Sequence, residues 1–125
     1  MKKTNRFSSM FICLCLVTVT LMAAPFDVPG KPGTPQVLDW GRDYCVITFT
    51  PPLSDGGSPI TSYIVEYKYK GMSDWEEVIN RAQTNKVKIS DLVEGSQIEF
   101  RVKAVNKAGE GEPSDPSKLI TIKPR

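Results

Sequence analysis

Short stretches of alternating apolar and polar residues recur along the chain from residue 34 onward. In the stretch SQIEFRVKAVN, residues 96–106, charged residues separate Ile98, Phe100 and Val102. Successive side chains of a β-strand point to opposite faces of the sheet, so this spacing predicts a strand with one apolar and one polar face. A chain built from such strands buries its apolar faces by packing one sheet on another.

Turn-forming residues separate these stretches at near-regular intervals. The segment PPLSDGGSP, residues 51–59, cannot continue a strand, because proline lacks the backbone donor and glycine favours positive φ. Strands are expected at residues 35–39, 43–50, 60–70, 75–79, 86–90, 96–106 and 118–122. Seven short strands separated by turns predict an all-β fold, a seven-stranded antiparallel sandwich.

The alternation also selects the residues expected to lie in the core. In the stretch DYCVITFT, residues 43–50, the side chains of Cys45, Ile47 and Phe49 share one face. The residues expected to mark the core are Cys45, Ile47, Phe49, Tyr63, Val65, Trp75, Leu92, Ile98, Phe100 and Val102. Because Cys45 has no cysteine partner outside the N-terminal stretch, the fold is expected to stand on packing without an internal disulfide.

The first 24 residues have the order of features that is typical of a secretory signal peptide. Basic residues precede an apolar run over residues 10–22, and Ala23 and Ala24 supply small residues for cleavage. An uncleaved membrane anchor is the alternative, because about 20 apolar residues can span a bilayer. Residues 25–33 are then expected to form a linker and residues 34–125 the folded domain.

The charge of the expected domain is close to neutral. Of the 16 Lys and Arg residues, Lys2, Lys3 and Arg6 lie in the N-terminal stretch, which leaves 13 against 14 Asp and Glu. Dispersed charges of both signs argue against nucleic acid as a partner. The chain has no histidine, so the usual ligand sets of zinc sites and the usual catalytic base near neutral pH are missing. We therefore expect a non-enzymatic protein with no catalytic residues, no cofactor and no metal.

The turn SDGG is the candidate contact loop of this chain. Asp55 can bond to nearby backbone, and Gly56 and Gly57 adopt conformations that other residues resist. The same turn is expected at an exposed tip of the sandwich, where binding loops are common. Asp55, Gly56 and Gly57 are therefore candidate partner-contact residues, and one carboxylate is too few for a calcium site.

Four basic residues are expected to point outward from two of the strands; they are Lys86, Lys88, Arg101 and Lys103. They could bind acidic polysaccharide or membrane phosphates. Glu66 and Glu99 are expected to lie near Arg101 and Lys103, so cross-strand ion pairs account better for this pattern.

Several separated motifs, in order, resemble those of one family. They are CVITFTPPLSDGGSPITSYIVEYK, then Trp75 with Val78, then LVEGSQIEFRVKAVNKAGEGEPSDPS. Together they resemble a fibronectin type III domain, which has an immunoglobulin-like sandwich fold. PGKPGTPQVLDW, DGGSPI and NKAGEGEPS are most similar to the fibronectin domains of the giant muscle proteins twitchin and titin.

Two positions depart from the family pattern. Phe49 stands where the family usually has a core tryptophan, and Ile98 stands where it usually has a tyrosine that ties a strand corner to the backbone. Ile98→Tyr is therefore expected to restore one hydrogen bond and stabilise the domain by about 0.5–1.5 kcal/mol.

The resemblance implies a protein-interaction or spacer module of the muscle sarcomere, with myosin of the thick filament or neighbouring immunoglobulin and fibronectin domains as partners. The leader-like N-terminus favours an alternative, a secreted or surface-tethered adhesion module in the secretory pathway, with membrane contact only if the leader is uncleaved. Some adhesive fibronectin domains bind integrins through an Arg-Gly-Asp tripeptide, which this sequence lacks.

Overall fold

The computed structural model describes residues 25–125, and the expected signal peptide or anchor lies outside the described residues. The strands are β1 (Gln36–Trp40), β2 (Cys45–Thr48), β3 (Ser62–Tyr69), β4 (Glu76–Glu77), β5 (Lys86–Ile89), β6 (Gln97–Asn106), β7 (Gly109–Glu110) and β8 (Ile120–Thr121). Among residues 25–125 no helix is long and apolar enough to cross a membrane.

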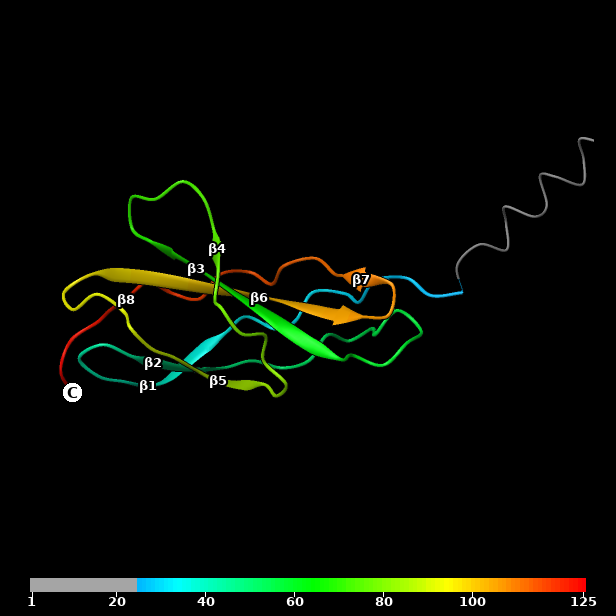
Figure 1. Ribbon diagram of the computed structural model, residues 1–125, viewed down its shortest axis with the longest axis horizontal. Coiled ribbons are helices and arrows are strands. Elements are labelled where there is room, and N and C mark those ends of the chain that lie inside the picture. The colour runs from blue at the N-terminus through cyan, green and yellow to red at the C-terminus, as the bar shows by residue number, and fades with distance from the viewer. Residues whose placement is uncertain (1–24) are drawn as a thin grey trace, which may run out of the picture.

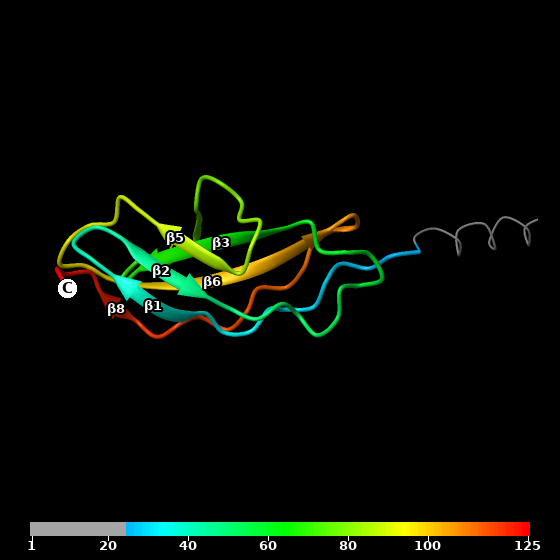
Figure 2. The ribbon, with the colours of Figure 1, turned by 90° about the horizontal axis from the view of Figure 1, so that it is seen from below.

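The strands form two antiparallel sheets. One has the order β1-β2-β5; the other has the order β4-β3-β6-β7, with β8 also paired to β6. Figure 1 shows the first sheet along one side of the molecule and the second along the other, and Figure 2 looks onto the first sheet with β3 and β6 behind it. The longest ladder joins β3 to β6, from Ser62 opposite Val105 to Tyr69 opposite Ile98.

This architecture confirms the all-β antiparallel sandwich expected from the alternation. Each expected strand has a counterpart, and β7 is an additional short strand that pairs with β6. The last expected strand, residues 118–122, is reduced to the short β8. Pro113 and Pro116 lie just before it, and proline cannot donate to a ladder.

Two serines, Ser114 and Ser117, hydrogen-bond to the backbone of β6 where these prolines prevent regular strand pairing. The backbone N–H groups of Ser114 and Ser117 donate to the carbonyls of Val102 and Phe100, each at 2.8 Å. The N–H groups of Val102 and Phe100 donate in return to the hydroxyls of Ser114 and Ser117, at 3.0 and 2.9 Å. We call residues 111–118 the serine segment, since its side chains satisfy buried groups that a regular strand would bond through its backbone.

The core lies between the sheets. Its buried members are Cys45, Ile47, Phe49, Tyr63, Val65, Ile89, Leu92, Ile98, Phe100, Val102, Ala104 and Ile122. Phe49 packs edge-on against Tyr63, with ring centroids 4.9 Å apart, at the position where the family has a larger aromatic. The core thus contains every residue expected there except Trp75.

Trp75 lies outside the core cluster, and the expectation of a core position for it is wrong. Its ring lies on the outer face of the second sheet, 4.5 Å from the guanidinium of Arg101 and 5.1 Å from the ammonium of Lys68. A tryptophan between two cations stays half-exposed because its ring attracts the charges while covering their apolar stems.

Tyr69, a tyrosine at another position, supplies a hydrogen bond at the corner where the family tyrosine is missing. Val93 donates its backbone N–H to the hydroxyl of Tyr69 at 3.3 Å, and Tyr69 lies directly opposite Ile98 in the ladder. Ile98 itself is fully buried. A tyrosine at position 98 would enter a closed site next to a corner that already has a hydrogen bond, so from the structure we predict a loss of stability for Ile98→Tyr in place of the gain expected from the sequence.

Candidate protein-contact site

The candidate contact loop is a turn fixed by its own side chains. The Oδ1 atom of Asp55 accepts from the N–H of Gly57 at 2.8 Å, and the hydroxyl of Ser54 accepts from the N–H of Gly56 at 3.3 Å. Gly56 and Gly57 have φ values of 78° and 94°, which favour glycine. The loop therefore presents Asp55 and Gly57 to solvent in a defined conformation, while Gly56 is half-buried.

The segment expected to be a linker, residues 25–33, lies along this loop. Backbone N–H groups of Asp27, Gly30 and Gly33 donate to carbonyls in residues 50–56, each at 2.9 Å. A Cβ atom at Gly56 would collide with the carbonyl oxygen of Asp27, so only glycine permits this approach. From Asp27 onward the segment is bonded to the domain.

Asn106, at the end of β6, joins three segments and was not singled out from the sequence. Its Nδ2 group donates to the carbonyls of Asp27 and Asp55, at 2.8 and 2.7 Å. Its Oδ1 atom accepts from the N–H groups of Ala108 and Gly109, at 2.8 and 3.3 Å. A buried amide with all four bonds filled fixes the loop rigidly. The sequence signal for this role of Asn106 was its position at the end of the stretch with the most regular apolar alternation.

The tip around this turn carries apolar side chains on its surface. Leu53 is fully exposed, Val28 is 43% exposed, and the ammonium of Lys107 lies 5.4 Å from the ring of Phe26. Aliphatic side chains beside a rigid turn can bury area against another protein.

The described residues contain no group of three or more carboxylate, cysteine or histidine side chains that could hold a metal ion. Burial, with a smaller contribution from the charge of Asp39, raises the pKa of Cys45 to about 11. The thiol therefore stays protonated at neutral pH and is a poor nucleophile.

The outward-facing charges of β3 and β6 pair across the strands, as expected for Glu66. Glu66 accepts from Nε of Arg101 at 2.6 Å and lies 3.2 Å from the ammonium of Lys103. Glu99 lies opposite Lys68 in the ladder. Arg101 and Lys103 are therefore engaged within the sheet and are weak candidates for binding anionic polymers. Lys86 and Lys88 lie apart from this network, on exposed positions of β5.

The fibronectin type III domain model matches residues 30–120. Human slow-type myosin-binding protein C is 37% identical over 93 residues, which are 74% of this chain and 8% of that protein. The crystal structure of domains A168–A170 from titin matches with a TM-score of 0.76 and 39% identity, over 78% of this chain and 33% of that one. The twitchin kinase region from Caenorhabditis elegans matches with a TM-score of 0.74 and 28% identity, over 78% of this chain and 17% of that one.

These similarities extend over the described domain, whereas the chain spans only a small part of the length of each relative. The family match includes the strands β1 to β7, the SDGG turn and the serine segment described above. The chain belongs to the fibronectin type III family.

Proposed function

We propose that the domain is a non-enzymatic spacer and protein-interaction module of muscle filaments that contacts myosin of the thick filament. The observation that carries the proposal is the placement of its ends: the described chain starts at one end of the long axis and finishes at the other (Figure 1). A module with this geometry transmits tension lengthwise and repeats head to tail. Fibronectin type III domains are generally non-catalytic structural modules, and the relatives include a myosin-binding protein and titin.

The bonds between residues 27–33 and residues 50–56 support the spacer part of the proposal. They fix the direction in which the chain joins the sandwich, because three backbone bonds and the amide of Asn106 oppose a swinging motion. A module held in this way keeps a set angle to whatever lies before it, which a ruler-like filament requires.

The partner-contact residues that we propose are Asp55, Gly56 and Gly57. The exposed carboxylate of Asp55 offers a charge on a rigid turn, and Leu53 next to it offers apolar area. A preorganised loop loses little conformational entropy on binding, so a small surface of this kind suffices for a repeated, weak contact.

Cosedimentation of the full chain with filaments of purified muscle myosin tests this function. We expect saturable recovery in the pellet and weaker recovery for Asp55→Asn, which keeps the turn and removes the charge. Asp74→Asn, at an exposed aspartate in another turn, is the matched control and should bind as the wild type does. Equal sedimentation with and without filaments would contradict the myosin contact.

A secreted or surface-tethered adhesion module is a second candidate, favoured by the basic start, apolar run and alanines of residues 1–24. Expression of the full chain in animal cells, followed by N-terminal sequencing, tests it. Protein in the medium that starts near Pro25 would support secretion. Cytosolic protein that retains Met1 would exclude it.

A further inference from the structure

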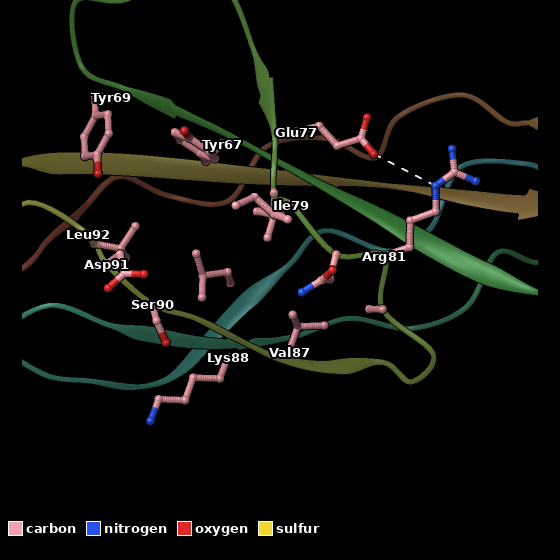
Figure 3. A pocket seen from close by; sticks show the side chains of 14 residues that line it. Tyr67, Tyr69, Glu77, Ile79, Arg81, Val87, Lys88, Ser90, Asp91 and Leu92 are labelled. Carbon is pink, nitrogen blue, oxygen red and sulfur yellow. Dashed lines mark ion pairs between the residues drawn. The ribbon is translucent and has the colours of Figure 1, made fainter.

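The two sheets part between β4 and β5 and leave an open groove there. Its volume is about 500 Å³, and we call it the β4–β5 groove. Its apolar and aromatic lining includes Tyr67, Tyr69, Val78, Val87, Ile89 and Leu92 (Figure 3). Ile79 also lines it and remains 93% exposed. Buried core side chains thus form the floor of a hollow with a large exposed aliphatic residue at its side.

One wall of this groove is an unpaired strand edge. β5 is the last strand of its sheet, and its pairing with β2 is regular from Lys86 to Ile89, with no proline and no bulge. Phe49 donates to the carbonyl of Asn85 at 3.2 Å, which makes these two residues a hydrogen-bonded pair. Bonded pairs alternate in antiparallel sheets, so the peptide groups of Lys86 and Lys88 face away from β2, toward the open edge.

The charges at this edge select the partner. The side chains of Lys86 and Lys88 are exposed, and Figure 3 shows Lys88 pointing away from the hollow. A second copy of the chain that paired antiparallel through β5 would place lysines opposite or beside each other, which is unfavourable. A strand with acidic residues beside these lysines pairs favourably, and its alternate side chains enter the groove.

We propose that the β4–β5 groove binds an extended peptide segment in which acidic and apolar residues alternate, added as a further strand on β5. The backbone of the segment bonds to the outward-facing peptide groups of Lys86 and Lys88, of which the carbonyl of Lys86 also accepts from the hydroxyl of Thr84 at 3.2 Å. Its acidic side chains lie beside the two ammonium groups, and its apolar side chains cover Ile79 and the groove floor. This inference rests on the proposed role in protein interaction and names the surface and the kind of partner.

The test is an NMR titration of the isotope-labelled full chain with the peptide acetyl-EVEVEV-amide. We expect saturable amide shifts confined to residues 77–82 and 86–92. Ile79→Asp should weaken binding by about tenfold, because it removes an apolar contact worth more than 1.4 kcal/mol. Leu38→Asp, at an exposed aliphatic residue of β1, the opposite edge strand of the same sheet, is the matched control and should bind within about twofold of wild type.

Charge selection is tested with the double variant Lys86→Glu, Lys88→Glu. It should lose the acidic peptide and gain acetyl-KVKVKV-amide. Absence of shifts in residues 86–92 at millimolar peptide, shifts centred elsewhere, or equal losses for Ile79→Asp and Leu38→Asp would each overturn the proposal. Since the peptide assay contains no myosin, these outcomes are independent of cosedimentation, and a chain that sediments with filaments but ignores the peptide would refute the groove alone.

Discussion

The two sheets separate along two long sides of the sandwich, and the edge strands on these two sides differ in regularity. On the side of β1, Pro35 precedes the edge strand and the register shifts between Val37 and Asp39. On the side of β5, the edge strand is regular and has neither feature. Prolines and bulges block the addition of a further strand, whereas a regular edge permits it.

The serine segment completes the first side, where hydroxyls bond to the backbone of β6. The β4–β5 groove leaves the second side open and lined with apolar side chains. The comparison indicates that an edge of this fold is closed by specific side chains, not by strand position. Variants on each side test this difference between the two edges.

The largest effect is expected on the closed side, for the double variant Ser114→Ala, Ser117→Ala. Each change leaves a buried N–H of β6 without its acceptor, at about 1–3 kcal/mol for each group. Urea unfolding of the variant should therefore show a loss of more than about 2 kcal/mol. Ser73→Ala, at an exposed serine, is the control. A double variant as stable as the wild type would show that the hydroxyls do not close this side.

In the core, next to Tyr69 of the open side, Ile98→Tyr should destabilise the domain by about 1–3 kcal/mol. The added ring has no room at a fully buried position beside Tyr69. Its urea midpoint, compared with that of Ile98→Leu, measures this. A stabilised Ile98→Tyr would restore the expectation drawn from the family pattern.

Tyr69→Phe should lower stability by about 1 kcal/mol, since it removes the acceptor for the N–H of Val93. The control is Tyr67→Phe, which also lies in the groove but loses a bond to the side chain of Glu76 in place of a bond to the backbone of the corner. Thermal unfolding of both variants gives the difference. Equal decreases in the two melting temperatures would show that the bond from Val93 to Tyr69 does not stabilise the corner.

Trp40→Phe, on the closed side, should change stability by less than about 1 kcal/mol. The variant loses apolar area but also removes Nε1, a buried donor without an acceptor among the described residues. The two effects oppose each other. A loss above about 2 kcal/mol in urea unfolding would show that the contacts of the indole, among them the guanidinium of Arg125 at 4.5 Å from its ring, outweigh the removal of the unpaired donor.

Reductant should have no effect on the unfolding midpoint. Cys45 lies on the strand between the two edge strands, is fully buried and is the only cysteine among the described residues. Unfolding the full chain with and without dithiothreitol tests this, and the same change in a Cys45→Ala variant would attribute any effect to the N-terminal cysteines. A lower midpoint in the wild type alone would show that Cys45 takes part in a stabilising disulfide.

Within the candidate site, the sequence predicted the turn but not its support. Asp55, Gly56 and Gly57 form a turn because their conformational preferences act over neighbouring residues. Asn106 bonds to Asp27, 79 positions away, and no local pattern records such a contact. The bonds from Asp27, Gly30 and Gly33 of the expected linker are likewise contacts between residues distant in the sequence.

The all-β sandwich and nearly all of its core residues could be predicted from the sequence alone, because strand alternation is a local property that repeats with every second residue. Tertiary structure decided which substitute was used where the pattern failed. The hydroxyl of Tyr69 replaced a missing tyrosine, serines replaced strand bonds, and Trp75 stacked on cations outside the core. Each choice depends on which distant side chain can reach an unsatisfied group, and only the folded arrangement sets those distances.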